Sequence, residues 1–76
     1  MKELLRVIAV NLVEYPNQVE IDEELRDGVL VLKLKVAPDD MGKVIGKQGR
    51  IAKAIRTVVK AAAIHGDKRV QVEIVQ

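Results

Sequence analysis

The sequence lacks several residue types on which enzymes and metal sites depend. It has no cysteine, no serine, one threonine (Thr57) and one histidine (His65). Without cysteine there is no disulfide framework and no thiolate chemistry, and catalysis by a serine–histidine relay is all but excluded. Metal sites use several histidine, cysteine or carboxylate ligands, and the first two types are nearly missing. We therefore expect a protein that is not an enzyme and that has no metal site and no cofactor.

Aromatic residues and long apolar runs are also scarce. Tyr15 is the only aromatic residue of the 76. The longest apolar stretches are far shorter than the roughly 20 residues that span a bilayer, and charged residues interrupt the apolar run at the N-terminus. We expect a cytoplasmic protein that forms a single domain over residues 1–76.

Charge is unevenly distributed along the chain. Residues 1–32 contain three cations and seven carboxylates, a net charge of −4, whereas residues 33–76 contain ten cations and four carboxylates, a net charge of +6. Residues 43–60 have no acid and six cations, which are Lys43, Lys47, Arg50, Lys53, Arg56 and Lys60. This asymmetry predicts an anionic partner for the second half.

The first half predicts a helix followed by a hairpin. Apolar residues at helical spacing indicate a helix over residues 2–14, which Pro16 ends. A second face with Val7, Val10 and Val13 is either a dimer contact or, as we favour, part of a wide core-facing stripe. Alternating residues 19–26 predict a strand with Leu25 on its apolar face. Asp27-Gly28 is a strong hairpin signal, and residues 29–36 form the partner strand.

The second half predicts two helices and a last strand. Asp39 and Asp40 suit the N-terminus of a short helix over residues 41–45, in which Gly42 either permits close packing or loosens the helix. A long helix over residues 49–64 ends at His65-Gly66-Asp67, where His65 suits the helix dipole. Residues 70–74 alternate as a strand that joins the hairpin edge. The order α-β-β-α-α-β predicts an α+β fold with three strands covered on one face by three helices.

The segment Gly46-Lys47-Gln48-Gly49 is the candidate binding loop. It is a tight turn between two helices, and its glycines can adopt positive φ and let another backbone come close. The N-terminus of the following helix directs unpaired N–H groups and a positive dipole end toward the turn, which suits a phosphate. On that helix, one face is apolar and the opposite face carries the cations Arg50, Lys53, Arg56 and Lys60, as expected of a helix that follows a sugar-phosphate chain.

The segment Val44-Ile45-Gly46-Lys47-Gln48-Gly49 resembles the V-I-G-x-x-G signature of KH domains. The predicted element order resembles the type II KH fold, and the whole chain is similar to small stand-alone bacterial KH proteins of the KhpA type. Ala52 departs from the pattern, since many KH domains have a larger aliphatic residue there. The resemblance implies that single-stranded RNA binds with its backbone on the loop and its bases in a groove, which Val44, Ile45 and residues of the second strand help to form. The implied RNA-binding residues are Gly46, Lys47, Gln48, Gly49, Lys43, Arg50, Lys53, Val44 and Ile45.

The resemblance also implies a cellular role. KhpA-type proteins are RNA-binding proteins and RNA chaperones that form homodimers or pair with a larger KH-domain protein, with links to cell-wall homeostasis and cell shape. We therefore expect single-stranded RNA and a second KH protein as partners. The alternative is a protein-interaction domain in which the first helix recruits a partner and RNA binding is incidental. The lack of aromatic residues disfavours RNA modules that stack bases on an aromatic sheet.

Overall fold

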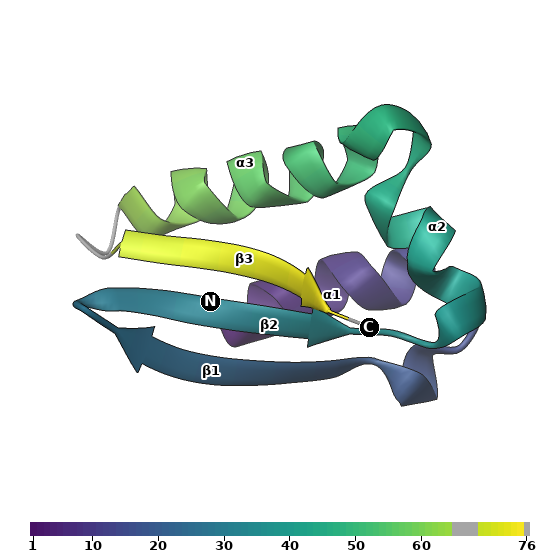
Figure 1. Ribbon diagram of the computed structural model, residues 1–76, viewed down its shortest axis with the longest axis horizontal. Coiled ribbons are helices and arrows are strands. Elements are labelled where there is room, and N and C mark those ends of the chain that lie inside the picture. Colours follow the sequence, from purple (N-terminus) through teal and green to yellow (C-terminus); the bar gives the residue numbers. More distant parts are fainter. Residues whose placement is uncertain (65–68, 76) are drawn as a thin grey trace.

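The computed structural model describes residues 1–64 and 69–75. Two long helices lie over one face of a three-stranded sheet, and a short helix closes the end of this helical layer (Figure 1). This confirms the predicted α+β order. The elements are α1 (Lys2–Leu12), η1 (Pro16–Gln18), β1 (Glu20–Arg26), β2 (Val29–Lys35), η2 (Pro38–Asp40), α2 (Met41–Ile45), η3 (Lys47–Gly49), α3 (Arg50–Ile64) and β3 (Arg69–Val75).

The sheet has the order β1-β2-β3 and is mixed. β1 and β2 are antiparallel, with Leu25 opposite Leu30, and β2 and β3 are parallel, with Leu32 beside Val72. The predicted turn at Asp27-Gly28 is confirmed, because both residues have positive φ (52° and 79°), as a tight hairpin turn requires. β3 therefore adjoins the central strand β2, and its other edge lies beside α3.

The first helix is shorter than predicted. It ends at Leu12 because Val13 adopts an extended conformation (φ −99°, ψ 160°), although its N–H still donates to the Ala9 carbonyl at 3.2 Å. Leu5 and Ala9 are fully buried, while Val10 and Val13 pack against the core. Val7 is 58% exposed, so the second apolar face of α1 is only partly used by the core. The proposed end of α3 at His65-Gly66-Asp67 lies outside the described residues.

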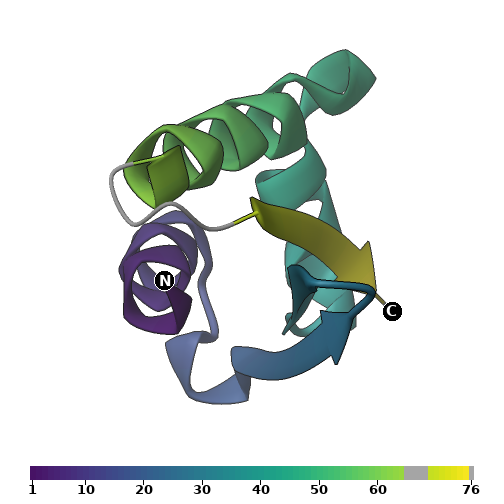
Figure 2. The same cartoon turned by 90° about the vertical axis from the view of Figure 1, so that its left-hand side faces the viewer.

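The core lies between the sheet and the two long helices. In Figure 2, α1 and α3 occupy the same side of the sheet, so the apolar faces of both helices meet the strands. Leu25 was expected on this buried face, but it is 75% exposed because it lies at the hairpin end of edge strand β1. The buried core comprises Leu5, Ala9, Val19, Ile21, Leu32, Leu34, Val36, Val44, Ile55, Val59, Ala63, Val70 and Val72.

The opposite face of the sheet is covered by charged side chains. Lys33 Nζ lies 2.9 Å from Glu24 Oε2, and Arg26 Nη2 lies 2.8 Å from the same oxygen. Hydrogen bonds from Lys33 and Arg26 hold the pKa of Glu24 below its ordinary value. Val31 of β2, which lies opposite Glu24 in the sheet, is only 1% exposed. Lys33 therefore belongs to an ion-pair network over an apolar side chain.

Asp40 links the end of α1 to the start of α2. It stands at the predicted N-cap position of α2, but its side chain makes no cap hydrogen bond there. Instead, Oδ1 accepts the Glu14 N–H and Oδ2 accepts the Tyr15 N–H, both at 3.0 Å, with Lys43 Nζ 3.5 Å away. Burial raises the pKa of Asp40, but the two backbone donors and Lys43 outweigh it and hold the pKa below its ordinary value. The residue is fully buried and fixes where α2 begins.

We predict that Asp40→Asn destabilises the protein, because the two backbone N–H groups bind different oxygens of the carboxylate and the amide places an NH2 donor against one of them. A depressed folded-state pKa means that the ionised carboxylate stabilises the fold above the unfolded-state value of about 3.9, and that this stabilisation is lost as pH falls below it. Urea unfolding should therefore show a gap between wild type and Asp40→Asn at pH 7 that narrows below about pH 4. The exposed neighbour Asp39 provides the control, and Asp39→Asn should stay within about 0.5 kcal/mol of wild type. Equal stability of Asp40→Asn and wild type at pH 7 would contradict this role.

Candidate nucleic-acid interface

The candidate loop lies between α2 and α3 and consists of Gly46 and the one-turn segment η3. Its backbone is left-handed at three of four positions, since φ is 76° at Gly46, 59° at Gln48 and 74° at Gly49. The Gly46 N–H donates to the Gly42 carbonyl (2.9 Å) and closes α2, while the Gly49 N–H donates to the Gly46 carbonyl (3.2 Å). The predicted positive φ at both glycines is thus confirmed. Gln48 adopts αL without being glycine, a conformation that is uncommon and costs free energy.

The two loop glycines differ in their surroundings. A Cβ atom on Gly46 would lie 2.5 Å from Cγ1 of Ile51, the residue that begins to pack α3 onto the core. A Cβ atom on Gly49 would have no atom within 4 Å. Gly46 is therefore required by packing as well as by φ, whereas Gly49 leaves open space beside the loop. A Cβ atom on Gly42 would also have no atom within 4 Å, so of the two alternatives for Gly42, close packing does not hold.

The loop has the features of an anion-binding turn. Lys47 and Gln48 are both exposed, and α3 starts at Arg50, immediately after Gly49. The Arg50 N–H donates to the Lys47 carbonyl, while the next N–H groups of this 15-residue helix have no partner within the helix and lie at the positive end of its dipole. Successive N–H groups in a turn that mixes αR and αL conformations form a concave site for an anion. The arrangement can hold a phosphate group beside the Lys47 ammonium.

The other predicted cations are spread around the loop. Lys43 lies 3.5 Å from both Glu14 and Asp40, so its charge is already compensated within the protein. Arg50 and Lys53 are exposed on the first turn of α3. Arg50 borders an apolar hollow toward α1, on the side of α3 away from β3. Of the predicted cations other than Lys47, Arg50 and Lys53 thus have no ion-pair partner among the described residues.

The two predicted apolar site residues have different positions. Ile45 is 37% exposed at the end of α2, next to Gly46. Val44 has no exposed surface and belongs to the core. It can support the loop from beneath, but it presents no surface to a ligand in this conformation.

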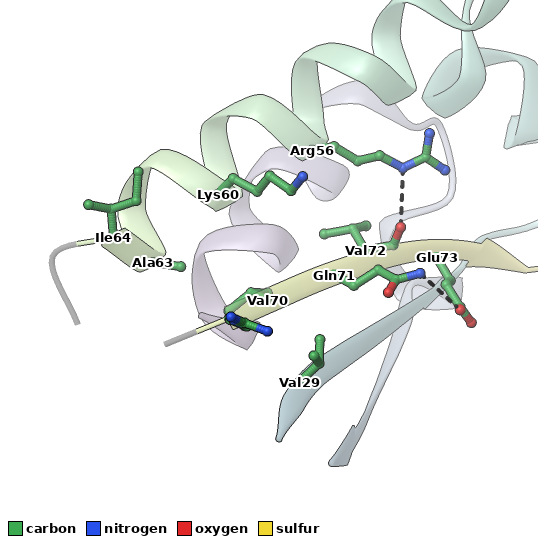
Figure 3. A pocket seen from close by; sticks show the side chains of 10 residues that line it. Val29, Arg56, Lys60, Ala63, Ile64, Val70, Gln71, Val72 and Glu73 are labelled. Atoms are coloured by element: carbon green, nitrogen blue, oxygen red, sulfur yellow. Dashed lines mark hydrogen bonds between the residues drawn. The ribbon is translucent and has the colours of Figure 1, made fainter. Parts of the chain in front are cut away.

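A groove runs along α3 on its β3 side and has a volume of about 650 Å³. In Figure 3, Arg56 and Lys60 extend from α3 over β3. The resemblance implied that residues of the second strand help to form the groove. β2 contributes Val29 to this lining, and the other strand residues in it come from β3, which lies between β2 and α3. The lining consists of Val29, Arg56, Lys60, Ala63, Ile64, Arg69, Val70, Gln71, Val72 and Glu73.

Arg56 and Lys60 were part of the basic helix face in the sequence but were not among the predicted site residues. Ordinary helical geometry places both on the face opposite the apolar one, so their position on the basic face of α3 could be predicted from the sequence. The strand that lies beside this face could not. The strand order, which places β3 at the edge of the sheet, and the hydrogen bond from Arg56 to Val72 show that β3, and not β2, faces these cations.

A second hollow, almost entirely apolar, lies between α1 and α3. Its volume is about 350 Å³. Val58 is 48% exposed and Leu12 36% exposed at this surface. The lining residues are Ile8, Leu12, Arg50, Ile51, Ala54, Ile55 and Val58.

The comparisons with known proteins decide the family. Residues 2–74 match the sequence pattern of the KH domain described as KhpA/KhpB. The chain belongs to this KH-domain family. It is 63% identical over 75 residues to the RNA-binding protein KhpA of Clostridium perfringens, which covers 99% of this chain and 100% of that protein. It is 50% identical over 76 residues to the RNA-binding protein KhpA of Listeria monocytogenes, with both chains fully covered.

Part of Era has a fold similar to that of this chain. The Aquifex aeolicus Era variant Y63A bound to GDP and aluminium fluoride aligns with a TM-score of 0.64 and 22% identity. Era in complex with a nucleotide analogue and part of 16S ribosomal RNA aligns with the same TM-score and 24% identity. Each alignment covers 96% of this chain and 28% of the Era chain. At this identity the likeness shows a similar fold over the aligned part of Era and no more.

Metal sites and membrane-spanning helices are not found in the part of the chain that the structure describes. Among residues 1–64 and 69–75, no cluster of three histidine, cysteine or carboxylate side chains is placed to hold a metal ion. None of the helices in the same residues is long and apolar enough to cross a membrane.

We predict that the two loop glycines differ in their tolerance of a methyl group. Gly46→Ala should lower the free energy of unfolding by about 2–5 kcal/mol, since it combines strain at positive φ with the clash against Ile51. Gly49→Ala, the matched control, should cost only about 1–2 kcal/mol from φ strain. Chemical denaturation of both variants measures the difference. Equal losses would show that the contact with Ile51 does not determine the role of Gly46.

Proposed function

We propose that this protein binds single-stranded RNA, with the sugar-phosphate backbone on the Gly46-Lys47-Gln48-Gly49 loop. The observation that carries the proposal is the loop itself, in which exposed Lys47, the open space at Gly49 and the N-terminus of α3 converge. Arg50 and Lys53 extend the positive surface along α3. The relatives named RNA-binding protein KhpA, which match over the whole chain, support the choice of RNA.

The bases of the bound strand would enter the groove between α3 and β3. α3 starts at the loop, and its residues from Arg56 onward line the groove. The lining combines apolar side chains with Arg56, Lys60 and Gln71. Single-stranded RNA exposes base edges that such a lining can contact, whereas the bases of a duplex are paired and stacked. We propose that Ile45, which is 37% exposed beside the loop, contacts the strand before it reaches this groove, with Val44 beneath it.

We also propose, from the resemblance to KhpA-type proteins, that the protein acts in the cytoplasm as an RNA chaperone and post-transcriptional regulator. Its proposed cellular role is in cell-wall homeostasis and cell shape. The proposed activity is binding, without an enzymatic step.

We predict that Lys47→Asp/Gln48→Asp leaves the fold intact and lowers RNA affinity by about 10- to 100-fold. The variant removes a charge-assisted contact of about 1.5–3 kcal/mol and places two carboxylates beside a phosphate. Fluorescence anisotropy with labelled single-stranded RNA, at two salt concentrations, measures the loss. The slope of log K against log salt should also become shallower by at least about 0.7.

The control is Lys2→Asp/Gln18→Asp, which makes the same change in net charge at exposed positions of α1 and η1. It should bind RNA within about twofold of wild type, because the long-range field changes equally but no phosphate contact is lost. Equal losses in both double variants would overturn the loop as the binding site.

A second proposal concerns assembly and follows from the apolar hollow between α1 and α3. We propose that a second copy of this chain covers the hollow, with a larger KH-domain protein as the competing partner. The half-exposed Val58 and the exposed Leu12 at its rim support this assignment, since exposed apolar surface of this kind marks interaction sites. This surface is also the basis of the alternative function, a protein-interaction domain.

We predict that Val58→Asp converts a homodimer into a folded monomer. Val58 is already 48% exposed, so the charge has access to water in the monomer but would be buried in the dimer. Sedimentation equilibrium measures the assembly state, and circular dichroism checks the fold. The proposal would fail if the wild type were monomeric at high protein concentration, or if Val58→Asp remained dimeric.

A further inference from the structure

Arg56 is held across the groove by a hydrogen bond to the edge strand. Its Nε donates to the Val72 carbonyl oxygen at 3.2 Å, and this bond joins the middle of α3 to β3 (Figure 3). Val72 itself is buried on the core face of β3, so its backbone is a fixed anchor. The bond therefore restricts where the Arg56 guanidinium can lie, although the side chain is exposed.

The anchored guanidinium keeps most of its donors. An arginine side chain has five N–H donors in a planar arrangement, and the bond to Val72 uses the one on Nε. The ion pairs found among the described residues involve Arg26, Lys33 and Lys43, and do not include Arg56. The two terminal nitrogens of Arg56 can thus offer a pair of parallel N–H groups to a ligand in the groove.

Arg56 lies within reach of a strand that is bound at the loop. It is six residues after Arg50, which places it about 9 Å along the helix axis from the first residue of α3. A strand whose phosphate rests on the Gly46–Gly49 turn and which follows α3 would bring its next bases to this position. There they would meet Arg56 at the entrance to the groove that it lines with Lys60.

A planar pair of N–H groups discriminates between bases by their acceptors. Guanine presents two adjacent acceptors, O6 and N7, to which arginine binds in a bidentate manner. Cytosine presents N3 and O2 side by side on its Watson–Crick edge. Adenine places a donor, N6, beside N7, and uracil places the N3–H group between its two carbonyl oxygens. Only guanine and cytosine therefore match two parallel donors.

We propose that Arg56 is a specificity-determining residue that selects guanine or cytosine, over adenine and uracil, at one position of the bound RNA. The inference rests on the proposed RNA-binding function and names the chemistry by which the groove reads a base. A bidentate contact to a phosphate is the competing use of the same side chain. Because phosphates carry no sequence information, that use would strengthen binding equally for all sequences.

The test compares four labelled RNAs, (UG)4, (UC)4, (UA)4 and U8, by fluorescence anisotropy. Wild type should bind (UG)4 and (UC)4 roughly 5- to 100-fold more tightly than (UA)4 and U8. Arg56→Lys keeps the charge but loses the planar pair of donors, so the four affinities should converge to within about twofold through loss of binding to (UG)4 and (UC)4. Arg56→Ala, which cannot donate at all, should remove the preference as well.

Lys60→Ala is the matched control, since Lys60 lines the same groove and is also exposed. As a point charge it should weaken binding to all four RNAs by the same factor and leave their ratios unchanged. Equal binding of all four RNAs by wild type would overturn the inference and leave the proposed function standing. A uniform loss in Arg56→Lys would assign Arg56 to phosphate instead. Binding to none of the four would overturn the proposed function and this inference with it.

Discussion

The close approach of the Gly46 backbone to the Ile51 side chain is the contact on which the interface depends. Ile51 packs the first turn of α3 against the core, and it occupies the space that a side chain at position 46 would need. The chain can therefore turn from α2 into α3 within the four residues Gly46–Gly49 only if position 46 is glycine and adopts positive φ. This turn sets the direction of α3, and with it the position of the loop at one end of the helix and of the groove along its side.

Asp40 provides a second constraint at the other end of α2. Its carboxylate holds the backbone of Glu14 and Tyr15 and so fixes the start of this five-residue helix against the end of α1. A helix of this length would be unstable alone. It is maintained here by the buried carboxylate at its start and by the turn onto Ile51 at its end, which together keep the loop in place relative to the core.

The charge asymmetry of the sequence becomes a spatial separation in the fold. Many of the acids lie on β1, which the sheet order places farthest from β3 and from the groove. Glu24 of β1 pairs with Lys33, and Glu14, which follows α1, pairs with Lys43. The cations of α3 lie near the opposite edge of the sheet, beside β3. There they can attract an anionic strand at a distance from the carboxylates of β1.

Most of the fold could be predicted because it depends on local patterns. The Asp27-Gly28 hairpin, the helical periodicity of α3 and the glycines of the loop each act within a few residues.

The features that could not be predicted involve contacts between residues far apart in sequence. Asp40 is of a residue type that often caps helices, but its hydrogen-bond donors, the backbone N–H groups of Tyr15 and Glu14, lie 25 and 26 residues earlier. Leu25 continues an alternating pattern, yet it is exposed because edge strand β1 extends beyond the helices that cover the sheet. The strand that faces the cations of α3 could not be predicted, because the residues of the last strand do not show which edge of the hairpin it joins.

The most direct test of the account is a map of where RNA contacts the protein. Amide chemical shifts of the ¹⁵N-labelled protein, followed during titration with (UC)4, report this residue by residue. The account predicts saturable shifts that are largest for the loop from Gly46 to Gly49, for the first turn of α3 and for the Arg56 Nε–H group, with little change on the ion-paired face of the sheet around Lys33. Largest shifts on that ion-paired face, or no saturable shift anywhere, would contradict it.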